Sequence, residues 1–322
     1  IGWGRLTPPG SRSGRPTVPV RSSPISLFAR ENLRHWLTLS GPPVVAEPSA
    51  DAQRIVEAFA GRGALFFGEI VRATGLLPSR VEQALAELAA QGCVTADGFE
   101  GLRALLLPDE KRAPFGTAQR RRHHKSVSSV ESGGRWSLLH AAIRADSEAV
   151  EETRAGRDEA VEAFARVLLR RYGVVTRRIA DKESLRVSWY ELLRVFRRLE
   201  ARGEIRGGYF VAGLSGEQFA PPEAIASLRS VRKTAPDGEL VAISAADPLN
   251  LVGILTAEPR VAAITVHRIL LRDGEPIAAL KAGEITRING HGIPEGTEVV
   301  ERTIEQALRV GSMPIALRPY YG

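Results

Sequence analysis

The stretch WYELLRVFRRLEARGEIRGGYFVAG, residues 189–213, joins an amphipathic helix to a short hairpin and carries five arginines. Its apolar side chains recur at the three- and four-residue spacing of one helical face, which predicts that this face is buried. Those apolar positions are Trp189, Leu192, Leu193, Phe196 and Leu199. The arginines are then left pointing outward, and Gly203 ends the helix before the hairpin begins.

A helix that leads directly into a hairpin is typical of the end of a winged helix-turn-helix domain, in which the hairpin is the wing. Two further helices are predicted upstream, one from Gly156 through Tyr172 and a short one in the region of residues 174–179. Residues 135–236 are therefore predicted to form a winged-helix domain, with its wing at residues 204–214.

The same order of elements is predicted earlier in the chain. Helical patterns cover residues 51–60, 66–74 and 78–91, and a hairpin with its turn at Asp97-Gly98 follows them. Residues 42–110 are therefore predicted to form a first winged-helix domain. The two halves share an order of elements rather than residue identities.

The remaining segments complete the predicted domain plan. Residues 1–41, which are rich in Pro, Ser and Arg, are predicted to form an extended strap that ends in a docking helix. Residues 111–134 are basic and lack periodicity, which is typical of a linker. Residues 237–322 contain short β-type runs and then a C-terminal helix, which indicates a small barrel or curled sheet. The predicted fold class is α+β: tandem winged helix-turn-helix domains followed by a small β-barrel-like module.

Charge is distributed unevenly along the chain, whose formal net charge is +7. Residues 166–235 contain fifteen Lys and Arg against seven Asp and Glu, so this block carries +8 and indicates an anionic partner such as a phosphate backbone. Arginine presents a planar fork that matches phosphate oxygens and guanine edges. The residues predicted to bind nucleic acid are Arg194, Arg197, Arg198, Arg202, Arg206, Tyr209 in the wing, and Trp136, which could instead anchor a domain.

The alternative is that this basic helix face is only solvated. Three glutamates in the stretch could pair with several of the arginines, but an exposed pair contributes only about 0–1 kcal/mol and does not explain why arginine dominates. The corresponding helix of the first domain, residues 78–91, is predicted to turn Glu82 and Glu87 outward. Carboxylates there would oppose a phosphate backbone, so that helix is expected to pack against protein.

Motifs of several enzyme classes are absent from the sequence. No Gly-x-x-x-x-Gly-Lys phosphate loop occurs, so no ATPase site and no cofactor are predicted in this chain. No HExxH, CxxC or G-x-S-x-G motif occurs, and the adjacent His123 and His124 lack metal-ligand spacing, so no metal site is predicted. Apolar runs are too short for a bilayer, and the lone Cys93 fits a reducing compartment, so a cytoplasmic protein without membrane contact is expected.

Several longer segments, in order along the chain to about Lys281, resemble one family. They are GWGRLTPP, VRSSPISLF, GALFFGEIVRATGLLPSRVEQALAELAAQGCVTADGFEGLRALL, GRWSLL, LLRRYGVVTRR, WYELLRVFRRLEARGEIRGGYFVAGLSGEQFAPPEA and VAISAADPLNLVGIL. Together they resemble the C-terminal region of the large helicase-related (Lhr) proteins, which are bacterial superfamily 2 helicases. No function is assigned to residues beyond about 282.

The resemblance implies a parent helicase whose ATPase domains lie N-terminal to this chain, in keeping with a first residue Ile1 rather than Met. Such a parent is an ATP-dependent translocase on single-stranded DNA, with 3′-to-5′ polarity and a preference for RNA:DNA hybrids, and is associated with DNA repair. The implied partners are single-stranded DNA or an RNA:DNA hybrid, the helicase core of the same protein, and further copies of the chain.

Three functions remain open. The first is a nucleic-acid-binding and assembly region that contacts DNA through the basic second winged helix. The second is a glycosylase-like domain that excises uracil or alkylated bases, because the family's C-terminal region is similar to tandem winged-helix DNA glycosylases. Its candidate catalytic residues are Glu217 and Gln218 in the loop after the wing, although the Gln-x-Gln motif of those glycosylases does not occur. The third is a purely structural oligomerisation module.

Overall fold

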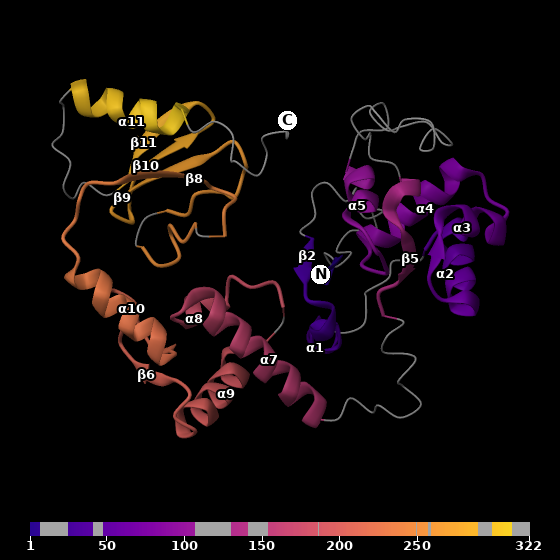
Figure 1. Ribbon diagram of the computed structural model, residues 1–322, viewed down its shortest axis with the longest axis horizontal. Helices are drawn as coiled ribbons and strands as arrows, with labels where there is room; N and C mark the ends of the chain where they lie inside the picture. The colour runs from indigo at the N-terminus through magenta and orange to yellow at the C-terminus, as the bar shows by residue number, and fades with distance from the viewer. Residues whose placement is uncertain are drawn as a thin grey trace. The chain divides into compact units, whose positions relative to one another are not determined.

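The computed structural model describes residues 1–6, 25–40, 48–106, 130–140, 154–185, 187–248, 250–256, 259–288 and 298–310 (Figure 1). Residues 111–129 of the linker predicted at residues 111–134, and the end of the chain, lie outside these residues. The chain divides into two compact units. One comprises residues 1–168 and 183–197, and the other comprises residues 169–182 and 198–322.

The predicted first winged-helix domain lies in the first unit and begins with three helices. They are α2 (Ala50–Arg62), α3 (Phe67–Thr74) and α4 (Pro78–Ala90), close to the predicted ranges. Ser49 caps α2 by accepting a hydrogen bond from the Ala52 N–H, and Gly75 ends α3 with a positive φ of 67°. The apolar stripe of each helix faces one buried cluster, whose members include Ile55, Ile70 and Leu85.

The sheet of this domain differs from the predicted hairpin. Strand β4 (Val94–Ala96) does not turn back at Asp97-Gly98; instead the chain enters helix α5 (Phe99–Leu106). The partner of β4 is β5 (Arg135–Leu138), which lies between β4 and the short β3 (Leu65–Phe66). All pairs in this sheet are antiparallel.

The physical reason for the difference lies in α5 and β5. Leu102 and Leu105 are buried at helical spacing on one face of α5. Gly101 lies so close to the Trp136 indole that a Cβ there would approach it to 2.8 Å. Residues 130–140 therefore complete the first domain, and the predicted start of the second domain at residue 135 is wrong.

The N-terminal segment packs on the same domain. Strands β1 (Gly2–Gly4) and β2 (Ser26–Phe28) pair antiparallel, and Trp3 is buried in the domain core. Residues 30–32 form a 3-10 turn, and α1 (Leu33–Ser40) follows it. Trp36 of α1 is buried, and its ring centroid lies 6.2 Å from that of Phe164 in the helix at residues 154–172, which is consistent with the predicted docking role of this helix.

A second helix-helix-helix-wing order follows, as predicted. Helices α7 (Arg154–Tyr172), α8 (Arg177–Ala180) and α9 (Trp189–Ala201) precede strands β6 (Arg206–Gly208) and β7 (Gln218–Ala220), which pair antiparallel. The boundary between the two units passes through α7 and α9. Helix α10 (Pro222–Lys233) begins at a proline and buries none of its residues.

The C-terminal module contains a four-stranded antiparallel sheet in the order β11-β10-β9-β8, visible in orange beneath α11 in Figure 1. Its strands are β8 (Leu240–Ser244), β9 (Arg268–Arg272), β10 (Glu275–Lys281) and β11 (Glu284–Arg287). Helix α11 (Glu298–Val310) covers one face through Ile304 and Leu308, and Val252 and Val261 belong to a second buried cluster.

The predicted barrel is not formed by the described residues, because β8 and β11 remain as the two edges of an open sheet. Two of the predicted β-type runs, residues 249–256 and 261–266, contain turns and irregular backbone. They carry apolar side chains because they cover the sheet, not because they belong to it. Of the described helices, none is both long and apolar enough to cross a membrane.

Candidate nucleic-acid interface

Helix α9 buries the side that the sequence predicts, with two differences. Leu192, Phe196 and Leu199 are at 0% exposure. Trp189 and Leu193 are only half-buried, and Val195, which lay outside the predicted stripe, is buried. The buried side is thus rotated slightly toward Val195, and it still determines which side of the helix solvent can reach.

The arginines of α9 and of the wing occupy that solvent-accessible side. Arg197, Arg198, Arg202 and Arg206 are exposed, as predicted. Arg194 is half-buried, and its Nη2 lies 3.9 Å from Asp158 Oδ2. Their exposure agrees with the sequence-based interpretation, and their contact with nucleic acid stays a prediction.

The acidic residues near these arginines have specific structural contacts. Glu191 accepts hydrogen bonds from Arg157 Nε at 2.7 Å and from the Ser188 N–H at 2.9 Å, and so joins the start of α9 to α7. Burial alone would raise the pKa of the Glu191 carboxyl, but the hydrogen bonds from Arg157 and Ser188 outweigh it and lower the pKa to about 2. Glu191 therefore stabilises the helix itself.

Glu204 and Glu200 lie at the junction of α9 and the wing. Glu204 Oε1 lies 2.7 Å from Arg202 Nε, an exposed pair. Glu200 Oε1 accepts a hydrogen bond from the Gly207 N–H at 2.8 Å. Because an exposed ion pair contributes only about 0–1 kcal/mol, the Arg202–Glu204 pair is weak enough for a phosphate group to compete with Glu204.

The wing loop between β6 and β7 is organised by Gln218. The Gln218 side chain is fully buried, and its Oε1 accepts hydrogen bonds from the backbone N–H groups of Phe210 at 2.9 Å and Val211 at 2.8 Å. Its Nε2 donates to the Val211 carbonyl at 2.8 Å. Tyr209, in the same loop, is 80% exposed.

These contacts contradict the prediction that Gln218 is catalytic. A catalytic amide must reach a water molecule or a substrate, whereas both ends of this amide are engaged by backbone groups inside the protein. Glu217, the other candidate, is half-buried just before β7, and its role stays a prediction. Proximity in sequence suggested these residues; because all three residues of β7 are buried, strand alternation gives no signal for the orientation of Gln218.

Trp136 is enclosed in the core of the first domain, which contradicts its predicted role of stacking on nucleic acid. Its exposure is 0%, and its ring meets the edge of Trp3 at a centroid distance of 6.1 Å within the core of the first domain. The run RWSL has the strand alternation that places Trp136 and Leu138 on one face. This alternation, rather than the neighbouring basic segment, is the sequence feature that predicts burial of Trp136.

The helix that corresponds to α9 in the first domain carries no arginine-rich surface. Glu82, predicted to point outward, is buried at 8% exposure. Glu87 accepts hydrogen bonds from the Ser49 N–H at 2.9 Å and the Ser49 hydroxyl at 2.6 Å. Both carboxylates lie against protein, in agreement with the expected packing role of α4.

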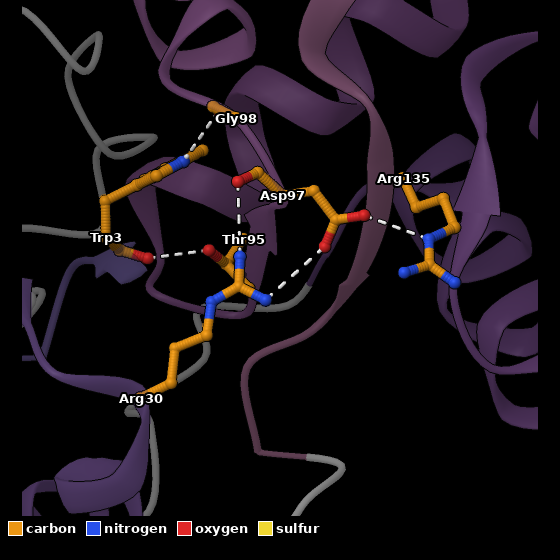
Figure 2. A network of polar contacts seen from close by, with 6 residues as sticks. All are labelled: Trp3, Arg30, Thr95, Asp97, Gly98 and Arg135. Atoms are coloured by element: carbon orange, nitrogen blue, oxygen red, sulfur yellow. Dashed lines mark hydrogen bonds and ion pairs between the residues drawn. The ribbon is translucent and has the colours of Figure 1, made fainter. Parts of the chain in front are cut away.

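A polar network that sequence reasoning missed joins the N-terminal segment to the end of β4 (Figure 2). Trp3 Nε1 donates to the Gly98 carbonyl at 3.1 Å, and the Thr95 hydroxyl donates to the Trp3 carbonyl at 2.6 Å. Asp97 lies between Arg135, at 2.9 Å, and Arg30, at 3.6 Å. The hydrogen bond from Arg135 is the main cause of a lowered pKa for the Asp97 carboxyl.

A hollow of about 290 Å³ lies beside this network, with mainly apolar walls that include Phe28, Phe59 and Leu138. The Asp97 carboxylate at its rim is neutralised by two arginines, which makes it a poor acid or base. Among the described residues, no three His, Cys, Asp or Glu side chains gather as metal ligands would. Asp97 is the only carboxylate among the described residues that line this hollow, so the hollow is not chosen as the candidate site.

Comparison with known proteins supports the resemblance to the Lhr helicases. Residues 154–240 match the family described as large helicase-related protein, winged-helix domain. The chain is 32% identical over 229 residues to Lhr helicase/probable uracil glycosylase of Mycolicibacterium smegmatis, covering 65% of this chain and 14% of that protein. It is 30% identical over 238 residues to Lhr helicase/uracil glycosylase of Escherichia coli, covering 66% of this chain and 15% of that protein. These matches confirm the resemblance found in the sequence: residues 154–240 match the Lhr winged-helix domain, and the chain is similar to the C-terminal region of Lhr helicases.

Proposed function

We propose that this chain is a nucleic-acid-binding region of an Lhr helicase, and that it holds the phosphate backbone with the exposed side of α9 and its wing. The observation that carries the proposal is the exposure of Arg197, Arg198, Arg202 and Arg206 on one helix and the strand that follows it. Burial of Leu192, Phe196 and Leu199 sets which side of the helix these arginines occupy. A cluster of guanidinium groups on a winged helix is well suited to phosphate.

The test is a double variant, Arg197→Gln with Arg198→Gln, which removes two charges and retains long side chains with good helix propensity. Affinity for single-stranded DNA is measured over a range of salt concentrations. Each lost phosphate contact is expected to reduce the slope of log affinity against log salt by ~0.7. Weakening should be similar for unrelated sequences, because phosphate contacts carry no base information.

The matched control is Arg54→Gln with Arg62→Gln, which removes two exposed arginines from α2 of the first domain. Its affinity and salt slope should stay close to those of the unmodified chain. If the folded Arg197→Gln, Arg198→Gln variant binds with the same affinity and slope as this control, α9 is not the phosphate-binding element.

The specific partners are part of the proposal. Single-stranded DNA and RNA:DNA hybrid are the expected ligands, with the helicase core of the same protein and further copies of the chain as protein partners. The sequence has no phosphate-binding loop of its own, so ATP hydrolysis would come from the helicase core. Light scattering with and without DNA distinguishes this role from that of a purely structural oligomerisation module, which would assemble equally well in both.

A second candidate function is removal of uracil from DNA, because both relatives carry uracil glycosylase in their names. Of the two candidate catalytic residues, Glu217 is the one whose side chain is partly accessible. Uracil-containing DNA is incubated with the chain and then treated with alkali, which cleaves strands at abasic sites. Cleavage that is lost in Glu217→Gln would support this function, and cleavage at the level of a no-protein control would exclude it for this chain.

A further inference from the structure

The loop of the second wing carries two adjacent aromatic residues with different environments. Tyr209, which directly follows β6, is 80% exposed. Phe210 is half-buried, and its ring lies against Gly208, where an added Cβ would come within 3.1 Å of it. One ring thus packs against the wing while its neighbour projects into solvent.

The backbone after Tyr209 is held by a buried side chain instead of by strand pairing. The Gln218 amide oxygen accepts hydrogen bonds from the Phe210 and Val211 N–H groups, and its nitrogen donates to the Val211 carbonyl, at distances of 2.8–2.9 Å. A buried amide without hydrogen-bond partners would cost free energy. The hydrogen bonds of Gln218 therefore favour the observed conformation of the wing loop. The loop is therefore organised on the C-terminal side of Tyr209.

The backbone before Tyr209 is held by the end of α9. Glu200 Oε1 accepts the Gly207 N–H at 2.8 Å, while Gly207 pairs with Phe219 across the wing. A Cβ on residue 207 would lie 2.8 Å from that Glu200 oxygen, so a side chain there would displace the Glu200 carboxylate from this hydrogen bond. Tyr209 consequently projects from a backbone that is fixed on both sides, which lowers the entropy cost of binding through its ring.

The chemistry near this ring fits an unpaired nucleotide. Arg206, in the same wing, is exposed and can neutralise a phosphate group. Aromatic rings beside arginines are the combination with which proteins bind single strands, because every base has a flat face that stacks. Bases inside a duplex already stack on both faces, whereas unpaired or terminal bases leave one face open.

We propose that Tyr209 stacks on an unpaired or terminal base of the bound nucleic acid, and that Gln218 is the positioning residue that holds the wing loop for this contact. The inference rests on the proposed function, because α9 must bring the strand to the wing. It adds that the wing favours single-stranded segments and strand ends over continuous duplex.

The first experiment compares Tyr209→Ala, Tyr209→Phe and Phe66→Ala in the full chain. Phe66 is a suitable control because it is an aromatic residue with 53% exposure that lies in β3 of the first domain, away from α9 and its wing. The ligand is single-stranded DNA that contains the fluorescent base 2-aminopurine, whose emission falls when an aromatic ring stacks on it. Tyr209→Ala should lower affinity ~5- to 100-fold and abolish the quenching. Tyr209→Phe and Phe66→Ala should retain both.

The second experiment tests Gln218 through a double-mutant cycle with Tyr209. If Gln218 acts by positioning Tyr209, Gln218→Ala should abolish quenching and should weaken binding little further in the Tyr209→Ala background. If Gln218→Ala does not fold, Gln218→Glu replaces it, because it keeps an oxygen for the two N–H groups but loses the N–H donated to Val211. Additive effects of the two changes would overturn the positioning role.

The outcomes separate this inference from the proposed function. If Tyr209→Ala keeps full affinity and quenching while Arg197→Gln with Arg198→Gln still reduces the salt slope, the stacking inference is wrong and phosphate binding stands. If neither set of variants changes binding, both are wrong. Equal loss of affinity for continuous duplex and for single strands in Tyr209→Ala would also overturn the preference for unpaired bases.

Discussion

Removal of the Glu191 carboxylate is expected to weaken the packing of α9 on α7 in a pH-dependent manner. Glu191 is hydrogen-bonded to Arg157 and to Ser188, and its pKa falls from an ordinary 4.5 to about 2. Each pKa unit corresponds to ~1.36 kcal/mol of differential stability, so the shift sets an upper bound of ~3 kcal/mol at pH 7. Because the Arg157 side chain is 43% exposed, solvent screening reduces the expected loss in Glu191→Gln to ~1–2 kcal/mol.

The sign of the pH dependence follows from the direction of the shift. The folded-state pKa is depressed, so the stabilisation is fully present above pH 4.5 and is lost as the pH falls through 4.5 toward about 2. The difference in free energy of unfolding between the unmodified chain and Glu191→Gln should therefore be larger at pH 7 than at pH 3.

The assay is urea unfolding followed by circular dichroism at both pH values, for Glu191→Gln, Arg157→Gln and the double variant. The cycle isolates the pair from the separate effects of each change, and a coupling of ~0.5 kcal/mol or more is expected at pH 7. An equal loss of stability at pH 7 and pH 3, or additive effects of the two substitutions, would refute the assignment of this ion pair as the cause.

Three further predictions concern the first domain. Trp136→Ala should lower its stability by ~3–5 kcal/mol because the ring is fully buried, while DNA affinity below the melting transition stays unchanged; a selective loss of single-strand binding would contradict this. Gly101→Val should cost ~1–3 kcal/mol by forcing apart α5 and the Trp136 ring, which a thermal melt would show as a lower Tm; an unchanged Tm would refute the close packing. Asp97→Asn should speed hydrogen exchange in β2 at pH 7, because it removes the ion pair with Arg30. The Asp97 pKa is lowered, so the difference in exchange rate from the unmodified chain should shrink below pH ~4. A pH-independent difference would exclude the carboxylate as its cause.

Periodic patterns made the helices predictable from the sequence. Features that depend on contacts between distant segments could not be predicted in the same way. The three helices of each winged-helix order lie near their predicted ranges because each has a stripe of apolar residues that burial requires. The wing hairpin after α9 was also predictable, because Gly203 ends the helix and glycines follow in the strand. The outward orientation of Arg197 and Arg198 followed from the opposite, buried side of the same helix.

Other features depend on pairing that a local pattern does not reveal. A turn-forming Asp97-Gly98 suggested a hairpin, yet the strand that pairs with β4 comes after a helix and a basic segment. The hydrogen bonds between Gln218 and the wing loop, and the polar network around Asp97, likewise join residues that no local sequence pattern links. In the C-terminal module, apolar runs predicted strands where the chain instead covers the sheet with irregular segments.

The place of β5 in the first sheet also determines where this protein can be divided. β5 is the middle strand of three, so a chain cut at residue 110 would leave β3 and β4 without their common partner. Such a truncation would expose the edges of both strands and empty the space that the Trp136 ring fills. An independently folding first domain must therefore extend through residue 140, and nascent chains complete its sheet only after β5 has been synthesised.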